Sequence, residues 1–136
     1  MVNSTLQCLT NNDLQRGKVI FNGQSAIAAL QAGVANQQID LALTDDHYIT
    51  GAVLRVANAA FGDTASAQVI MPDGVTVAAQ FITNWSMRSD AQEQFNFETS
   101  YPAKVPAGLI LRLVYNSIGN QPPTVAINYD LHKCLV

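Results

Sequence analysis

Apolar and polar residues alternate over most of this chain, in short stretches separated by turn-forming residues. Residues 38–44 place Ile39, Leu41 and Leu43 on one side and polar or small residues on the other. The longest such stretch, residues 47–57, is rich in β-branched and aromatic side chains, which suit a pleated surface. Because successive side chains of a strand point to opposite faces, this alternation predicts half-buried strands.

The end of the chain shows the same pattern twice. Residues 108–115 and residues 124–131 are apolar at every second position, and a loop rich in Asn, Gly and Pro joins them. Two such stretches on either side of a turn-rich loop predict a β-hairpin. The alternation then predicts that Leu111 and Ile127 are buried on the same side of one sheet.

A second hairpin is predicted around Pro72-Asp73-Gly74, between strands at residues 65–71 and 75–82. Proline presets φ at the first central position of a turn, and aspartate fits the second. Glycine then takes the left-handed conformation that follows, at no steric cost. This is the clearest turn signal in the sequence.

The remaining segments add shorter elements. Residues 25–35 fit either a helix or a strand, because their alanines favour helix while a glycine interrupts the stretch. A strand is favoured, since everything that follows is β. The other expected elements are strands at residues 18–22 and 92–99 and a polar connection at residues 84–91.

Seven to eight short strands, with turn signals roughly every 8–12 residues, predict an all-β fold. We expect an antiparallel, jelly-roll-like β-sandwich. Its length of 136 residues suits one domain. We assign residues 17–136 to that domain and residues 1–16, which have little core-forming pattern, to an N-terminal arm.

The composition points to protein contacts. Only 12% of the residues are charged, against about 25% in typical soluble domains, while the chain holds 11 Asn and 11 Gln. Charge is depleted where protein surfaces meet, so this composition favours a protein that packs against neighbours. The alternative is an uncharged but well-hydrated monomer. Lys and Arg are scattered singly at a net charge of −3, which disfavours nucleic-acid binding, and no apolar run is long enough for a transmembrane helix.

No residue pattern asks for catalysis. Asp45-Asp46-His47 is the only local cluster of acidic and His residues, and such a cluster at a strand start is more often a solvated turn. Two cysteines, Cys8 and Cys134, and two histidines, His47 and His132, are too few and too spread along the sequence for a zinc site. We therefore expect no enzyme, no cofactor and no metal.

Two arginines are candidates for contacts between subunits. Arg112 lies between Ile110 and Val114 on the predicted outer face of its strand. It either lies flat on its own sheet, covering apolar surface with its stem, or anchors an interface, where Arg is enriched. Arg55 invites the same two interpretations.

Aromatic side chains in loops are candidates for stacking on a sugar. Trp85 and Tyr101 fall in predicted connections, whereas Tyr115 and Tyr129 fall on positions that face the core.

Parts of the chain resemble a known family. Residues 101–133, which begin YPAKVPAGLILRLVY, and residues 49–71 are similar in style to small β-sandwich virion structural proteins of tailed bacteriophages. The resemblance is to jelly-roll-like capsid decoration or cement proteins in particular. It lies in the strand order, the amide-rich strands and the loop VPAG before a long apolar strand, over about residues 38–133.

This resemblance implies a non-enzymatic protein, made in the host cytoplasm and located in the virion. It implies a homo-oligomer, with a trimer favoured, that binds the major capsid protein or another virion protein and stabilises the shell. A tail, collar or fibre-associated virion protein fits the same style. The alternative from a different class is a carbohydrate-binding β-sandwich module.

Overall fold

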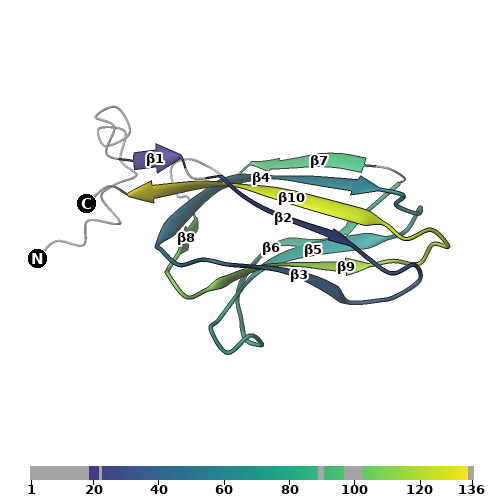
Figure 1. Cartoon of the computed structure of the whole chain (residues 1–136), viewed down its shortest axis with the longest axis horizontal. Coiled ribbons are helices and arrows are strands. Elements are labelled where there is room, and N and C mark those ends of the chain that lie inside the picture. Colours follow the sequence, from purple (N-terminus) through teal and green to yellow (C-terminus); the bar gives the residue numbers. More distant parts are fainter. Residues whose placement is uncertain (1–18, 22, 89–90, 97–102, 135–136) are drawn as a thin grey trace, which may run out of the picture.

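The computed structural model describes residues 19–21, 23–88, 91–96 and 103–134, which form two facing antiparallel sheets (Figure 1). Within these ranges, no helix is long or apolar enough to cross a membrane. The expected N-terminal arm, residues 1–16, lies outside the described residues.

The first sheet, called sheet A, contains six strand segments. Its order is β1-β10-β4-β7, with β2 also paired to β10 and β8 also paired to β4. β1 and β2 pair with the two halves of β10, so they follow one another along one edge of the sheet. β7 and β8 follow one another along the opposite edge in the same way. The segments are β1 (Val19–Phe21), β2 (Gln24–Ala29), β4 (His47–Ala57), β7 (Ala91–Asn96), β8 (Ala103–Val105) and β10 (Thr124–Cys134).

The second sheet, sheet B, has the order β3-β9-β5-β6. Its strands are β3 (Gln37–Ala42), β5 (Thr64–Ile70), β6 (Val77–Ser86) and β9 (Ile110–Asn116). All of its pairings are antiparallel.

The ten described segments occupy eight strand positions, because β1 with β2, and β7 with β8, each fill one position. Numbered along the chain, the sheet orders become 1-8-3-6 and 2-7-4-5. The first position therefore pairs with the last, the second with the seventh, the third with the sixth and the fourth with the fifth. A long hairpin rolled into two sheets gives this arrangement, which is a jelly roll. The predicted all-β, jelly-roll-like sandwich of seven to eight strands is confirmed.

The core lies between the two sheets and follows the predicted alternation. Residues of β9 and β10 at every second position are almost wholly buried, and they form one apolar cluster with residues of β4 and β5. The most deeply buried members from β9 and β10 are Leu111, Leu113, Tyr115, Val125, Ile127, Tyr129 and Leu131.

The predicted hairpin between residues 108–115 and 124–131 is wrong. β9 pairs with β3 and β5 in sheet B, whereas β10 pairs with β1, β2 and β4 in sheet A. Residues 117–123 cross between sheets that lie about 10 Å apart. Leu111 and Ile127 are both fully buried, as expected, but they belong to opposite sheets.

The predicted hairpin at Pro72-Asp73-Gly74 is confirmed. β5 and β6 pair on either side of it, and Gly74 has a φ of 77°. The N–H of Gly74 donates to the carbonyl of Met71 at 2.9 Å. The strand favoured within residues 25–35 is also present, as β2, and the chain turns after it.

Residues 84–91 are not simply a connection, because β6 continues to Ser86. The β5–β6 ladder shifts register between Ala65 and Ala67, and Asn84 has a φ of 46°. The Ser66 hydroxyl accepts a hydrogen bond from the N–H of Asn84 at 2.9 Å. A bulge thus lets this polar segment stay in the sheet.

Candidate functional site

Three connections meet at one end of the sandwich, at the right of Figure 1. They are residues 30–36 between β2 and β3, residues 58–63 between β4 and β5, and residues 117–123 between β9 and β10. We call this region the loop end. Its three segments are far apart in the sequence, so hydrogen bonds between them decide its shape.

Backbone and hydroxyl groups join the first connection to the third. The N–H of Ser117 donates to the carbonyl of Val34 at 3.1 Å, and the Ser117 hydroxyl accepts from the N–H of Gly33 at 3.2 Å. The N–H of Leu30 donates to the carbonyl of Pro123 at 2.8 Å. These bonds hold residues 30–36 and 117–123 side by side.

The buried carboxyl group of Asp63 joins the second connection to the third. Only 1% of this residue is exposed. It accepts hydrogen bonds from the Ile118 N–H at 2.8 Å, the Tyr115 hydroxyl at 2.8 Å and the Ala60 N–H at 3.1 Å. Burial, together with the bond to Asp63, raises the pKa of Tyr115 well above its usual range, so its hydroxyl stays a donor. Three donors satisfy the carboxyl group and make the loop end well ordered.

A close backbone approach tightens the same junction. A Cβ atom on Gly119 would lie 2.6 Å from the Cβ of Ala60, which is shorter than side chains tolerate. Residues 58–63 and 117–123 can therefore touch only with glycine at position 119.

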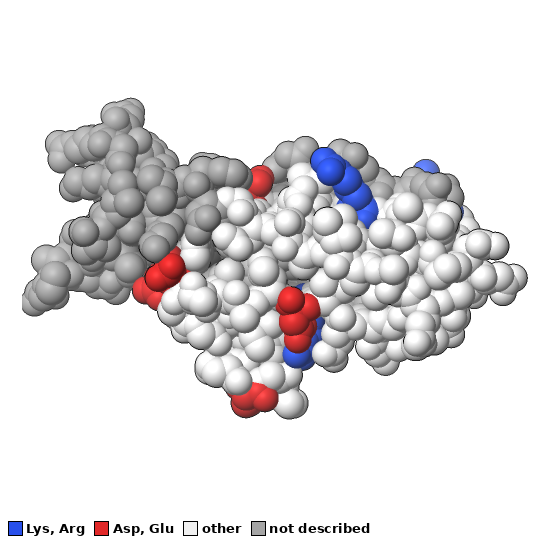
Figure 2. All heavy atoms as spheres, in the orientation of Figure 1, with Lys and Arg blue, Asp and Glu red and all other residues white. Residues whose placement is uncertain are grey.

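Apolar side chains project from this scaffold into solvent. Phe61 is 80% exposed, Ile118 63% and Val34 38%. Asp63 is the one charged residue of the three connections, and it is buried. The three connections therefore carry exposed apolar and uncharged polar side chains on a hydrogen-bonded base. Met87 of the β6–β7 connection, which precedes the exposed Arg88, is bonded to the same base at Gly62 and Asp63. Figure 2 shows that charged side chains are also few and separated over the face on which β2 and β3 lie.

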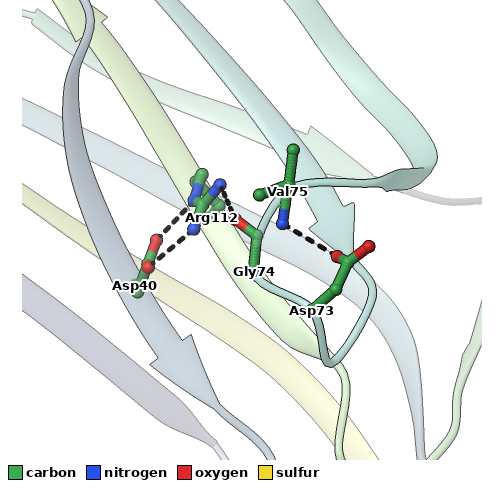
Figure 3. A network of polar contacts seen from close by, with 5 residues as sticks. All are labelled: Asp40, Asp73, Gly74, Val75 and Arg112. Carbon is green, nitrogen blue, oxygen red and sulfur yellow. Dashed lines mark hydrogen bonds and ion pairs between the residues drawn. The ribbon is translucent and has the colours of Figure 1, made fainter.

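A second polar network holds the β5–β6 turn against the outer face of sheet B (Figure 3). Arg112 donates from Nε and one terminal nitrogen to the two carboxylate oxygens of Asp40, at 2.8 and 3.0 Å. Its other terminal nitrogen donates to the carbonyl of Gly74 at 2.9 Å. Hydrogen bonding to Asp40 raises the pKa of Arg112 above its ordinary value. We call Arg112, Asp40 and the Gly74 carbonyl the arginine clamp.

The turn itself is stiffened by Asp73. Its carboxylate accepts hydrogen bonds from the N–H groups of Val75 and Thr76 and from the Thr76 hydroxyl. These bonds favour the charged form and hold the pKa of Asp73 below its usual value, with the Thr76 hydroxyl contributing most.

The predicted interface residues lie on two different sheets. Ile110, Arg112 and Val114 belong to β9 in sheet B, and Arg55 belongs to β4 in sheet A. Arg112 is only 8% exposed, and its guanidinium group is engaged in the clamp on its own sheet. Ile110 and Val114 are half-buried, while Arg55 is exposed on the outer face of sheet A. An interface role for these residues stays a prediction.

The two stacking candidates have different outcomes. Trp85 lies in β6 rather than in a loop, opposite Ala65, and is 41% exposed at the edge of sheet B. Tyr101 lies outside the described residues. Tyr115 and Tyr129 are buried in the core, as predicted.

Residues of the Asp45-Asp46-His47 cluster make hydrogen-bonding contacts with the protein backbone. His47 is buried, and its Nδ1 lies 2.9 Å from the carbonyl oxygen of Asp45. Asp46 accepts a hydrogen bond from the N–H of Ala107 at 2.8 Å. Within the described part of the chain, no group of three or more His, Cys, Asp or Glu side chains is placed to hold a metal ion.

The sequence pattern does not reveal the loop end, because Phe61 and Ile118 are single apolar residues within otherwise polar or small connections. One signal was available in the sequence. Each of the two precedes a glycine, in Phe61-Gly62 and Ile118-Gly119.

No protein-family model matches the chain, and no curated protein matches it. A solved structure of the infectious bursal disease virus Gt strain is similar at 13% identity and a TM-score of 0.37, over 84% of this chain and 31% of that one. The chain spans about a third of that viral chain, and between 31% and 37% of the chains in the solved structures of the Gx strain and of the VP2 subviral particle of the same virus.

Carbohydrate-binding modules are similar at comparable levels. The family 32 module of C. perfringens NanJ, solved with galactose, has 12% identity and a TM-score of 0.47, over 82% of this chain and 93% of that one. A family 29 module from Piromyces equi has 14% identity and a TM-score of 0.41, over 82% and 79% of the two chains. The fold assignment rests on the sheet topology, and these distant likenesses add no functional evidence.

Proposed function

We propose that the protein is a non-enzymatic structural protein of a bacteriophage virion, a capsid decoration or cement protein. In this proposal it docks on the shell through the loop end and associates with copies of itself. The observation that carries the proposal is the exposure of Phe61, Ile118 and Val34 on a hydrogen-bonded scaffold at one end of the sandwich.

The energetics of association favour such a surface. Burying these side chains against a partner removes apolar area from water, at about 25 cal/mol per Å². No charge of the three connections has to lose its water, because Asp63 is already buried and satisfied within the chain. The hydrogen bonds within the scaffold lower the entropy lost on docking.

The proposal assigns the major capsid protein, or another virion protein, as the partner, and the virion as the location after synthesis in the host cytoplasm. No residue is given a catalytic role, and neither cofactor nor nucleic acid takes part. The resemblance over residues 38–133 to virion decoration proteins supports the same assignment.

The test uses particles from a phage strain in which the gene for this chain is disrupted, with the purified protein added back. We expect the wild type to sediment with these shells. The double variant Phe61→Asp/Ile118→Asp should lose about tenfold or more in affinity, because two charges must then be desolvated at the contact. Val75→Asp is the matched control, since Val75 is 78% exposed but lies on the β5–β6 turn.

Equal binding by the wild type and the double variant would show that the protein does not dock through the loop end. Failure of the wild type to bind shells would show that the capsid is not its partner. Binding to purified tails rather than to heads would assign the protein to the tail, collar or fibre, the runner-up position in the virion.

A carbohydrate-binding role is the second candidate, and Trp85 favours it. Trp85 is 41% exposed on β6, and the preceding residue, Asn84, is exposed at a bulge, so this strand presents an aromatic residue and an amide in succession. Stacking on a sugar needs such a pair of features. Micromolar binding on a glycan array that Trp85→Ala abolishes, with no binding to shells, would favour this alternative.

A further inference from the structure

Each sheet of the sandwich has two edges, and an edge strand presents unpaired backbone N–H and C=O groups on its outer side. Proteins usually guard such edges with charged side chains, prolines, bulges or covering segments, because an open edge invites another strand. In sheet A the edges are β2, following β1, and β7, followed by β8. In sheet B they are β3 and β6.

Three of these edges carry a feature that hinders the pairing of another strand. β3 contains Asp40 in its middle, and β7 and β8 contain Glu93 and Lys104. β6 has no charged residue, but its ladder with β5 shifts register at three places within ten residues. Such irregularities bend an edge away from regular pairing.

β2 has none of these guards. Gln24–Ala29 contains no charge and no proline, and its six residues pair with β10 without a register shift. No described strand pairs with its outer side. Ile27, in the middle of the strand, is 70% exposed on the outer face. A regular, uncharged edge with a large exposed apolar residue is the pattern expected where another strand adds.

We propose that β2 pairs antiparallel with β2 of a second copy, about a two-fold axis at Ile27, so that the two copies of sheet A form one continuous sheet. The inference rests on the proposed function, because it identifies the contact through which the protein associates with itself. It replaces the trimer that the family resemblance implies with a dimer.

The alternation of side chains along β2 fixes the register of this pairing. Residues directly opposite each other in an antiparallel pair lie on the same face of the sheet. Ile27 then faces Ile27 of the partner, and each Ser25 faces Ala29, all on the outer face. On the inner face each Ala26 faces Ala28. Ile27 and its symmetry mate bury their exposed surfaces against each other.

Self-complementarity is the reason for choosing a second copy as the occupant. Pairing of β2 with itself brings no like charges together, and only small side chains flank the central isoleucines. Pairing of β3 with itself would bring the Asp40 side chains of two copies into proximity, which is unfavourable. The sequence of β7 likewise contains an acidic residue, Glu93. The described edges thus permit self-pairing at β2 and oppose it at β3.

The contact is short, so the free dimer should be weak, in the class that buries less than about 1,200 Å². The measurement in solution must therefore extend to high protein concentration.

The test is sedimentation equilibrium of the full chain from about 1 to about 200 µM. We expect the wild type to approach a dimer, and Ile27→Lys to raise the dissociation constant about tenfold or more through two facing ammonium groups. Val75→Lys is the matched control, since it places the same charge at an equally exposed β-branched position and should dimerise like the wild type. Unchanged melting temperatures would show that both variants fold.

A charge pair makes the two-fold register testable. Because residue 27 faces its own symmetry mate, a mixture of Ile27→Lys and Ile27→Glu should form heterodimers while each variant alone stays monomeric. A wild-type oligomer that Ile27→Lys leaves intact, or a trimer, would overturn the β2 contact and leave shell docking standing. A wild type that stays monomeric throughout would also overturn it, and the sedimentation assay with shells would then decide the proposed function separately.

Discussion

At the scale of the single residue, a substitution at Gly74 measures how much a left-handed backbone conformation lowers stability. Its φ is 77°, and a Cβ atom built on it would meet nothing within 4 Å. The penalty for adding a Cβ atom at this position therefore comes from the left-handed conformation and not from a clash of that atom. We expect Gly74→Val to lower the free energy of unfolding by about 1–2 kcal/mol, as measured by urea denaturation.

Gly74→Asn is the control for this prediction, because Asn adopts the left-handed conformation more readily than a β-branched residue. It should cost less than Gly74→Val. A loss of only a few tenths of a kcal/mol for valine would mean that the turn rearranges at little cost.

Asp63 shows what a single position in a sequence does not disclose. The Gly62-Asp63 pair predicts a loop, and a loop aspartate is ordinarily solvated. Here its carboxyl group is buried by Tyr115 and Ile118, which follow more than 50 residues later in the sequence. No local pattern encodes such a contact, since it exists only once β5 and β9 lie side by side.

At the scale of the element, the positions of the strands were easier to predict than the pairing of each strand with its neighbours in a sheet. The β5–β6 hairpin was predictable because a short Pro-Asp-Gly turn reverses the chain, so that the following strand must pair with the preceding one. β9 and β10 alternate in the same way and also follow one another, yet they belong to different sheets. Alternation identifies the buried face of a strand, and strands of two facing sheets bury the same kind of face.

The arginine clamp was hidden for a related reason. Alternation correctly placed Arg112 on the outer face of β9. It did not reveal that Asp40 of β3 lies directly opposite Arg112 in the ladder, or that the β5–β6 turn curls back over the guanidinium group. An outward position is therefore not always an exposed one.

The clamp makes a prediction about the β5–β6 turn. We expect Arg112→Ala to cost about 1–3 kcal/mol, because three charge-assisted or backbone hydrogen bonds are lost together. Asp40→Ala should cost less, since the bond to the Gly74 carbonyl remains and Asp40 is partly solvated. In a double-mutant cycle the two should couple by about 1 kcal/mol, with urea denaturation as the measurement.

Hydrogen exchange gives the local readout of the same prediction. The Gly74 and Met71 N–H groups, which bond across the turn to Met71 and Thr76, should lose protection in Arg112→Ala. Additive losses without coupling, and unchanged exchange in the turn, would show that the ion pair does not hold it.

At the scale of the whole molecule, the jelly roll separates the two proposed contact surfaces. The loop end gathers three connections at one end of the sandwich, and the β2 edge runs along its side (Figure 1). A copy can therefore offer the loop end to a shell while its β2 edge stays open to a second copy, whose loop end the antiparallel pairing turns in the opposite direction. The arrangement follows from pairing the first strand position with the last and the second with the seventh.

The single core between the sheets supplies the prediction that belongs to this scale. Leu111 in sheet B and Ile127 in sheet A are both fully buried in the same apolar cluster. Replacing either with Ala should cost about 2–5 kcal/mol, from lost transfer free energy plus a cavity. Because both sheets share one core, the chain should unfold in one transition. The single Trp, Trp85 in sheet B, should therefore report the loss caused by Ile127→Ala in sheet A.

The measurement is urea unfolding followed by tryptophan fluorescence and by far-ultraviolet circular dichroism on the same samples. The two midpoints should coincide for the wild type and for both core variants. Ile27→Ala, at a 70% exposed position of sheet A, is the matched control and should stay within about 0.5 kcal/mol of the wild type. If Ile127→Ala moved the dichroism midpoint and left the fluorescence midpoint unchanged, the sheets would be unfolding independently. β9 and β10 belong to different sheets and share no ladder, so only side-chain packing across the core couples them. Independent unfolding would therefore mean that this packing couples the two sheets only weakly.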